Sequence, residues 1–389
     1  MKYMFFLIAI IYLAFISLGL PDSLMGAAWP AMHKALGVPI SYMGIVSSVV
    51  IICTIISSLF SSRIIKRFGT GIVTAVSVLF SSIGLFGYSI TNSLPILCLW
   101  AIPYGLGAGA VDAALNNYVA INMKSRHMSW LHCFWGVGTI IGPYIMSSCL
   151  SYYEKWQYGY CIVSLIQVSI AVLMFVGIPL WKKYEKSEIP VTKTKSSYGI
   201  IDTIKIKGVP LILLTFFCYS ALEATTGAWA SSYLSEYKGF SVDASAGFAA
   251  LFFLGITFGR FMCGFVSDKI GDKKLIHMGF IVIISGSILI MIPMRLIQPS
   301  LIGLVIIGIG CAPIYPALIH SVPTCFGKDK SQSIIGLVMA SACLGAAIMP
   351  LLFGVISNIT GLYIFPVCIM GFALLAAIIY GTLVFCIKE

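Results

Sequence analysis

The chain has 389 residues, of which 59% are hydrophobic and only 10% are charged. A soluble domain carries roughly 25% charged residues, so this much apolar surface cannot be buried in one soluble core and much of it must face lipid. The net charge of +11 could suggest a nucleic-acid partner. However, the basic residues fall in the short gaps between apolar runs, which is typical of membrane topology and not of a phosphate-binding face.

Twelve apolar runs follow one another along the sequence, each close to the roughly 20 residues that a membrane-spanning helix needs. The first run follows a lone Lys2, as a signal peptide would, but Asp22 interrupts it and eleven more runs follow, so we expect an uncleaved first helix. The predicted spans lie near 5–29, 41–62, 71–91, 94–121, 128–152, 158–181, 209–235, 243–267, 275–294, 299–322, 332–357 and 361–385.

The distribution of lysine and arginine predicts the orientation. If the N-terminus is cytoplasmic, 20 of the 24 basic residues fall on the inner side, and only Lys34, Lys155, Lys238 and Arg295 fall on the outer side. Cytoplasmic loops carry the excess of basic residues, so we expect both termini to be cytoplasmic.

The segment 182–207 is the one long polar gap, and it separates six predicted helices in 1–181 from six in 208–389. The two sets carry matching features. Asp22 and Glu223 each stand four residues before a glycine, and Gly138 and Gly345 each stand five residues before a proline. We therefore predict an all-α membrane protein of two pseudo-symmetric six-helix bundles joined by a basic cytoplasmic linker, with the solute bound between the bundles near the midplane.

Three carboxylates lie inside predicted spans: Asp22, Asp112 and Glu223. A charged side chain at bilayer depth costs roughly 2.5–3.5 kcal/mol, so each is a candidate for carrying a coupling ion. Burial disfavours the charged form of a carboxyl group, which lets proton binding alternate with exposure to each side. Asp22 and Glu223 are expected to face one another across a central cavity, although either could be a static partner of a buried donor. A proton is the expected ion, and sodium stays open.

Other chemistries have little support in the sequence. The chain has twelve cysteines, none in a C-x-x-C pair, and we read them as small buried hydrophobes. It contains no phosphate-binding loop of the G-x-x-x-x-G-K type, no nucleophile elbow and no cluster with metal-ligand spacing. We expect neither an enzyme nor a bound metal or cofactor.

The loop at 264–274 reads GFVSDKIGDKK. Gly264 permits close helix contact, Asp268 can cap the next helix or bridge to a neighbour, and Lys269 helps to hold the loop inside. The equivalent loop of the first half, SSRIIKRFGTG at 61–71, keeps the basic residues and the glycines but lacks the acid. The pattern resembles the conserved cytoplasmic loop of the major facilitator superfamily, Gly-x-x-x-Asp-Arg/Lys-x-Gly before a basic cluster. The resemblance implies a role in conformational gating.

Within that superfamily, the fourth predicted helix is similar to that of the fucose–proton symporter family and its sugar-transporter relatives. That family carries an acid followed four residues later by Asn, as Asp112 and Asn116 do here, and an acid before a proline in the first helix, as Asp22 and Pro30 do. This chain departs from the family in one respect: the acid of the fourth helix is often Glu in the family, whereas here it is the shorter Asp112. The seventh predicted helix, with Glu223 followed by an aromatic residue, resembles that of a related branch of the superfamily. This resemblance implies a hydroxylated cargo, which the paired donor and acceptor groups of Asn116 would suit. Asp112 could carry the proton or accept a hydrogen bond from a sugar hydroxyl, and an interhelical polar clasp is the alternative for Asn116.

Further residues are assigned by type and place. Arg260 is expected to form a salt bridge that locks one conformation, and His132 to be a helix-end histidine satisfied by backbone or water, with a proton relay as the alternative. Trp29 and Trp229 could be interfacial anchors or lids on a sugar ring, and core packing is the default expectation for Tyr104, Trp135, Tyr219 and Tyr315. The expected substrate-binding set is Asp112, Asn116, Asn117, Tyr104, Trp135, Tyr219, Tyr315, Trp29 and Trp229.

The sequence thus predicts a carrier of a bacterial-type inner membrane, acting as a monomer by alternating access, that takes up a sugar or similar solute with a cation. One rival is a proton-driven exporter of small organic compounds, because Gly138 to Pro143 overlaps the fifth-helix signature of such exporters. That signature continues with two glycines, where this chain has Met146 and Ser147. A second rival, a membrane receptor or scaffold without transport, would leave three intramembrane acids unexplained.

Overall fold

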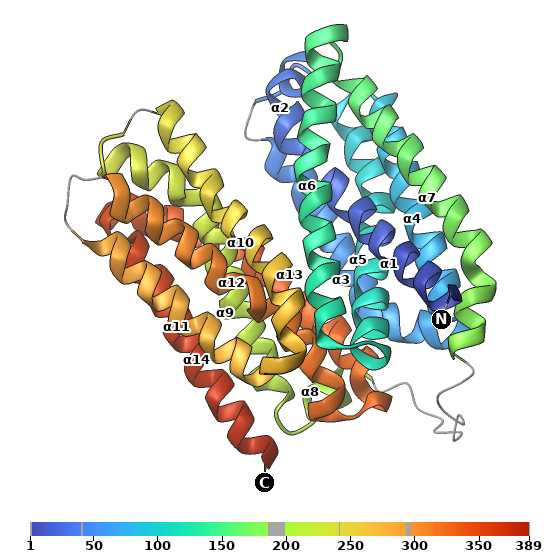
Figure 1. Cartoon of the computed structure of the whole chain (residues 1–389). Coiled ribbons are helices and arrows are strands. Elements are labelled where there is room, and N and C mark those ends of the chain that lie inside the picture. The colour runs from blue at the N-terminus through green and yellow to red at the C-terminus, as the bar shows by residue number, and fades with distance from the viewer. Residues whose placement is uncertain (1, 40–41, 186–198, 241, 293–296, 389) are drawn as a thin grey trace. The chain divides into compact units, whose positions relative to one another are not determined.

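A computed structural model describes residues 2–39, 42–185, 199–240, 242–292 and 297–388 of the chain (Figure 1). Within these residues all regular secondary structure is helical, and twelve spans are long and apolar enough to cross a membrane, which confirms the predicted fold class and number of spans. The chain forms two compact units: Met1–Tyr118 with Leu131–Tyr198, and Val119–Trp130 with Gly199–Glu389.

This division differs from the predicted one in two respects: the predicted linker 182–207 is divided between the units at Gly199, and one turn changes sides. The turn Val119–Trp130 belongs to the second unit, although the helices on both sides of it belong mainly to the first. Most of the predicted linker, residues 186–198, lies outside the described residues. The helices of the first unit are α1 (Lys2–Asp22), α2 (Leu24–Ala35), α3 (Met43–Phe68), α4 (Thr70–Ser89), α5 (Leu94–Asn122), α6 (Ser125–Tyr153) and α7 (Trp156–Glu185), of which α5 and α6 continue into the turn.

The second unit begins with a short helix within the predicted linker. Its elements are α8 (Ile200–Ile204), α9 (Val209–Ser232) with a π-helical turn η2 (Tyr233–Tyr237), α10 (Val242–Ile270), α11 (Asp272–Met291), α12 (Ile297–Phe326), α13 (Lys328–Thr360), a 3-10 turn η3 (Leu362–Ile364) and α14 (Phe365–Lys388). Gly208, with φ of 88°, turns the chain into α9, whose first turn contains a proline where no N–H is needed.

The first predicted span is broken at its candidate coupling residue, since α1 ends at Asp22 and α2 begins at Leu24. The cause is Pro21, which has no N–H to bond the carbonyl of Ser17 one turn earlier. Gln167 on α7 donates its Nε2–H to that carbonyl at 2.6 Å. Irregular backbone at membrane depth is tolerated only where protein groups satisfy it, and here the side chain of a neighbouring helix does so.

A second freed carbonyl lies opposite this break. Pro143 interrupts the bonding of α6, and the residue four positions before it is Thr139. Ser23, directly after Asp22, donates its hydroxyl to the Thr139 carbonyl at 2.7 Å. The two prolines therefore produce one joint, in which the interrupted parts of α1 and α6 are connected through Ser23.

The two halves repeat the same close helix contacts. A Cβ atom on Gly138 of α6 would lie 2.8 Å from the Leu20 amide nitrogen of α1, and one on Gly345 of α13 would lie 3.1 Å from the Phe217 carbonyl carbon of α9. In each half, therefore, the glycine that precedes a proline lets the fifth span approach the first span at backbone distance. Real Cβ atoms essentially never come within 3.0 Å of such atoms, so glycine is required at Gly138.

The loops at 61–71 and 264–274 share a turn as well as a pattern. Gly69 and Gly271 have φ of 82° and 83° and ψ of 156° and 150°, and each ends one helix and begins the next. L-residues with a side chain rarely adopt this conformation, so glycine sets both corners. Gly327 and Gly361 take a similar conformation at other helix ends, so this turn is common to the two loops without being specific to them.

We expect Gly138→Ala to destabilise the protein, because the new methyl group would overlap the backbone of α1. Overpacking of this kind costs about 1–3 kcal/mol. Gly381→Ala on α14 is the matched control, since nothing lies within 4 Å of the added atom. Thermal unfolding of the detergent-solubilised variants should show a lower midpoint for Gly138→Ala alone. Equal midpoints would show that α6 does not depend on this approach.

Candidate functional site

Asp22 is held at the break of the first span by two donors from other helices. Tyr104 of α5 donates its hydroxyl to Oδ1 at 3.1 Å, and Trp135 of α6 donates its indole N–H to Oδ2 at 2.8 Å. Asp22 nevertheless remains exposed. A carboxylate accepts and does not donate when it is ionised, so this arrangement suits its charged form and ties α1 to α5 and α6.

Asp112 begins a chain of polar contacts that runs from α5 to α6. Asn116, one turn later, donates its Nδ2–H to the Asp112 Oδ1 at 2.7 Å and also lies 3.0 Å from the Asp112 backbone oxygen. Its Oδ1 lies 3.1 Å from Nε2 of His132, a contact in which the histidine donates. Asn116 is fully buried, His132 is nearly so, and Asp112 is partly exposed. Sequence reasoning assigned His132 to backbone or water and missed this link, because spacing does not reveal contacts between helices.

Glu223 occupies in the second unit the sequence position that Asp22 occupies in the first, but its surroundings differ. Its Oε1 lies 3.4 Å from Nη2 of Arg260 on α10, and the two side chains are 21% and 4% exposed, respectively. A guanidinium at membrane depth requires such a partner. The expected salt bridge of Arg260 is therefore present and its partner is Glu223. The facing of Asp22 and Glu223 across a cavity stays a prediction.

The two tryptophans predicted as anchors or lids, Trp29 and Trp229, lie in different environments. Trp29 is only 2% exposed and packs in the core of the first unit with Leu85 and Tyr88, so it does not lie at a surface. Trp229 is partly buried and donates its N–H to the Pro350 carbonyl at 2.9 Å, which fastens α9 to the proline of α13. The surface position expected for Trp29 is therefore wrong, whereas the anchor or lid role of Trp229 stays a prediction.

Three further residues of the predicted substrate-binding set are engaged within their units. The Tyr219 hydroxyl donates to the Cys311 carbonyl at 3.0 Å, and the Tyr315 hydroxyl lies 3.2 Å from the sulfur of Met339. Asn117 is buried beside Asn116 on α5. In the first unit, the structure brings together Asp22 with Tyr104 and Trp135, and Asp112 with Asn116.

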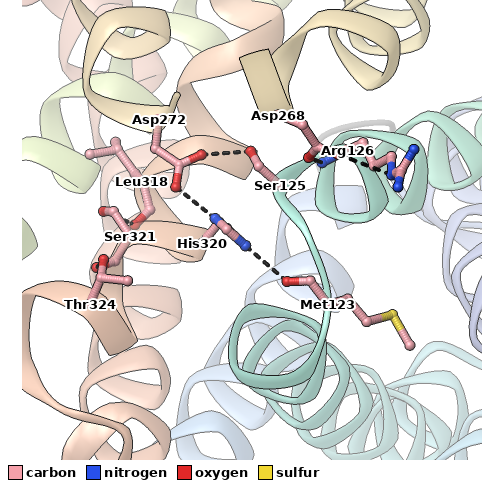
Figure 2. A network of polar contacts seen from close by, with 9 residues as sticks. All are labelled: Met123, Ser125, Arg126, Asp268, Asp272, Leu318, His320, Ser321 and Thr324. Atoms are coloured by element: carbon pink, nitrogen blue, oxygen red, sulfur yellow. Dashed lines mark hydrogen bonds and ion pairs between the residues drawn. The ribbon is translucent and has the colours of Figure 1, made fainter. Parts of the chain in front are cut away.

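Several polar contacts gather where α10 ends and α11 begins (Figure 2). Asp268 accepts the backbone N–H of Arg126 at 3.1 Å and forms an ion pair with the side chain of the same residue at 3.1 Å. Arg126 is the second residue of α6, whose first N–H groups have no partner within the helix, so Asp268 satisfies a helix N-terminus. The expected bridge from Asp268 to a neighbour is thus made to the α5–α6 turn.

The other two residues of the predicted gating loop play different parts. A side chain on Gly264 would collide with the indole of Trp130, so the glycine admits that ring against α10. Lys269 is exposed. Sequence reasoning missed Asp272, which accepts a hydrogen bond from Ser125 at 2.6 Å, and its partner His320 (Figure 2). The available signal was an acid at the start of a basic run.

The sequence matches the family model described as Major Facilitator Superfamily over residues 11–297 and again over 211–388. The chain belongs to the major facilitator superfamily. Its relatives include Bypass of stop codon protein 6 of Saccharomyces cerevisiae, 24% identical, covering 90% of this chain and 77% of that protein. They also include the glucose/mannose transporter of Bacillus subtilis, 23% identical, covering 76% and 74%.

Solved structures confirm the predicted family fold. The Escherichia coli fucose:proton symporter superposes with a TM-score of 0.72 at 15% identity, over 97% of this chain and 98% of that one. The proton:xylose symporter superposes with a TM-score of 0.80 at 12% identity, over 98% and 96%. Other relatives, each 23% identical, are described as a hexuronate transporter of Bacillus subtilis and the class B tetracycline resistance protein of Escherichia coli. The family is therefore shown to be one of transporters whose cargoes differ widely.

The Glu223–Arg260 pair predicts an asymmetric response to mutation. Glu223→Gln leaves the more deeply buried guanidinium without its carboxylate, and removing one partner of a buried pair costs about 3–5 kcal/mol. Arg260→Gln leaves a partly exposed carboxyl group that can take up a proton, so we expect a smaller loss. The double variant should recover much of the stability lost in Glu223→Gln. Thermal unfolding of the three variants measures this, and additive losses would show that the two residues do not interact.

Proposed function

We propose that this protein is a secondary active transporter that accumulates a sugar or similar polyhydroxylated solute together with a proton. The observation that carries the proposal is the Asp112–Asn116–His132 chain, which holds a partly exposed carboxylate inside the membrane-spanning part of the first unit. Hydrogen-bonding groups of this kind suit hydroxyls better than an apolar cargo. The glucose/mannose relative and the two sugar–proton symporters of the same fold support the same class of cargo.

Asp22 is the proposed proton carrier. In its ionised form it accepts hydrogen bonds from Tyr104 and Trp135, which connect α1 to α5 and α6. Protonation removes the charge that makes these hydrogen bonds strong, so it weakens both connections at the break in the first span. Proton binding is thereby linked to the packing of three helices. Glu223 is a second candidate, with Arg260 as its counter-charge, and sodium stays the alternative ion.

Two observations favour other cargoes. The approach of Gly138 and Gly142 to α1, together with the tetracycline-resistance relative, favours proton-driven export as the second candidate function. The hexuronate relative favours an acidic sugar over a neutral one. Uptake by proteoliposomes with glucose, glucuronate and an apolar drug, each with and without an imposed proton gradient, separates the three.

The lysine and arginine distribution supports an orientation with both termini in the cytoplasm, and the proposed location is a bacterial-type inner membrane. The protein is proposed to act as a monomer, because the two units together provide the two halves that alternating access requires.

We expect Asp22→Asn to abolish uphill accumulation of the solute while leaving downhill exchange. The amide resembles the protonated acid and cannot release a proton, so the exchange of bound solute continues without coupling. Glu154→Gln is the control, because Glu154 is an exposed acid of the same unit. Accumulation is measured in proteoliposomes at acidic and neutral pH, with and without sodium. Wild-type accumulation by Asp22→Asn would remove Asp22 from the coupling role, and a strict sodium requirement would change the ion.

We expect Asn116→Ala to weaken solute binding at least several-fold. Because Asn116 is fully buried, it acts on the solute through Asp112, whose oxygen it holds. Losing a partner in such a network costs about 1–3 kcal/mol, or roughly five- to a hundred-fold in affinity. Ser148→Ala on α6 is the control, since that exposed hydroxyl bonds only within its helix among the contacts described. An unchanged affinity would remove this chain from the binding site and favour the exporter.

A further inference from the structure

His320 on α12 connects two segments that are distant in sequence (Figure 2). Its Nδ1 lies 2.6 Å from Oδ2 of Asp272, at the start of α11, and its Nε2 lies 3.1 Å from the carbonyl oxygen of Met123, at the end of α5. The Ser125 hydroxyl donates to the other oxygen of Asp272 at 2.6 Å. Asp272 and His320 therefore hold the α5–α6 turn at two points.

The partners of the imidazole determine how many protons this arrangement contains. The Met123 carbonyl can only accept, so Nε2 must carry a hydrogen. A neutral imidazole has a single N–H, which leaves Nδ1 with a lone pair directed at a carboxylate oxygen. Both contacts form together only when one more proton is shared between His320 and Asp272. The closed network therefore binds a proton that the open one releases.

The charge of Asp272 is balanced by the protonated His320, because the neighbouring acid and base pair with each other. Asp268 has Arg126 as its ion-pair partner, whereas the ion-pair partner of Asp272 is His320. The titratable groups that interact with the pair are Asp268 of α10, Cys325 of α12 and Tyr380 of α14. Behind them, Asp268 interacts with Arg126 of the turn and Cys325 with Lys273 of α11.

We propose that His320 and Asp272 form a proton-operated latch on the α5–α6 turn. The turn belongs to the second unit, but α5 and α6 continue from it into the first, at Tyr118 and Leu131. A conformational change that carries α5 and α6 with the first unit must therefore pull the turn away from α11 and α12. The protonated latch opposes this change, and loss of the proton permits it.

The latch makes the rate of the transport cycle depend on the pH at the membrane face where the α5–α6 turn lies. Lysine and arginine placement predicts that this face is cytoplasmic. Acidification there closes the latch and slows the cycle, and alkalinisation opens it. This consequence rests on the proposed function: a carrier that brings in protons with its solute would be slowed by the acid it delivers.

Hydrogen exchange of the backbone amides in 119–130 tests the latch on the purified full-length protein, with no solute present. His320→Gln keeps a donor for Met123 but cannot take up a proton, so it resembles the open latch. The ratio of exchange rates, variant over wild type at the same pH, cancels the intrinsic effect of pH on exchange. We expect a ratio of about five near pH 6, the factor that one hydrogen bond of ordinary strength represents, and about one near pH 8.

Three further variants separate the latch from simple packing. Asp272→Asn should behave like His320→Gln. Ser125→Ala should loosen the turn equally at both pH values, because it removes a contact without removing the proton. His277→Gln on α11 is the control, since the described contacts of that exposed histidine are the backbone of its own helix and the ring of Tyr380, and neither is part of the latch; its ratio should stay near one.

A His320→Gln ratio that is the same at both pH values, or an Asp272→Asn ratio of one throughout, would overturn the latch. A transport assay completes the test, because proteoliposomes should show wild-type transport that falls as the pH on this face is lowered and His320→Gln transport that does not. If no solute is transported, the proposed function fails, while the exchange ratios still decide the latch.

Discussion

A helix inside a membrane has to satisfy its polar groups from within the protein, because the hydrocarbon of the bilayer neither donates nor accepts hydrogen bonds. The break in the first span shows this constraint directly. Pro21 frees the carbonyl of Ser17, and Gln167 bonds it. Pro143 frees the carbonyl of Thr139, and Ser23 bonds it. Asp22 follows Pro21 directly and accepts a hydrogen bond from Trp135 of α6, so the break in α1 and the candidate site lie at the same place.

Much of the fold follows from the sequence because lipid makes a strong and local demand on composition. The twelve spans could be predicted from hydropathy alone, since a spanning helix needs a continuous apolar run. The matching Gly–Pro pairs at Gly138 and Gly345 indicated a repeat, and both glycines do lie at backbone contacts with the first span of their half. The bridge made by Asp268 could also be expected, because an acid at a helix end has few alternatives to a neighbouring N-terminus.

The rest could not be predicted because it depends on which helices are neighbours. His132 and Asn116 are 16 residues apart, and Met123 and His320 are 197 apart, so no local spacing relates them. Trp29 illustrates the opposite failure. Its place near the end of a span favoured a surface position, yet the break after Asp22 turns α2 so that the ring packs against the core. Periodicity gives the face of a helix, but a kink changes what that face meets.

The duplicated halves separate packing from chemistry. The glycine contacts and the turns at Gly69 and Gly271 occur in both halves, because both must bring the same helices to backbone distance. The acids do not share their surroundings. Asp22 is held by two neutral donors, whereas Glu223 faces the guanidinium of Arg260. An ionised Asp22 leaves a net negative charge that a proton can remove, while Glu223 and Arg260 already balance one another. The repeat therefore supplies one scaffold twice, and the difference in partners makes Asp22 the carboxylate better suited to exchange a proton in each cycle.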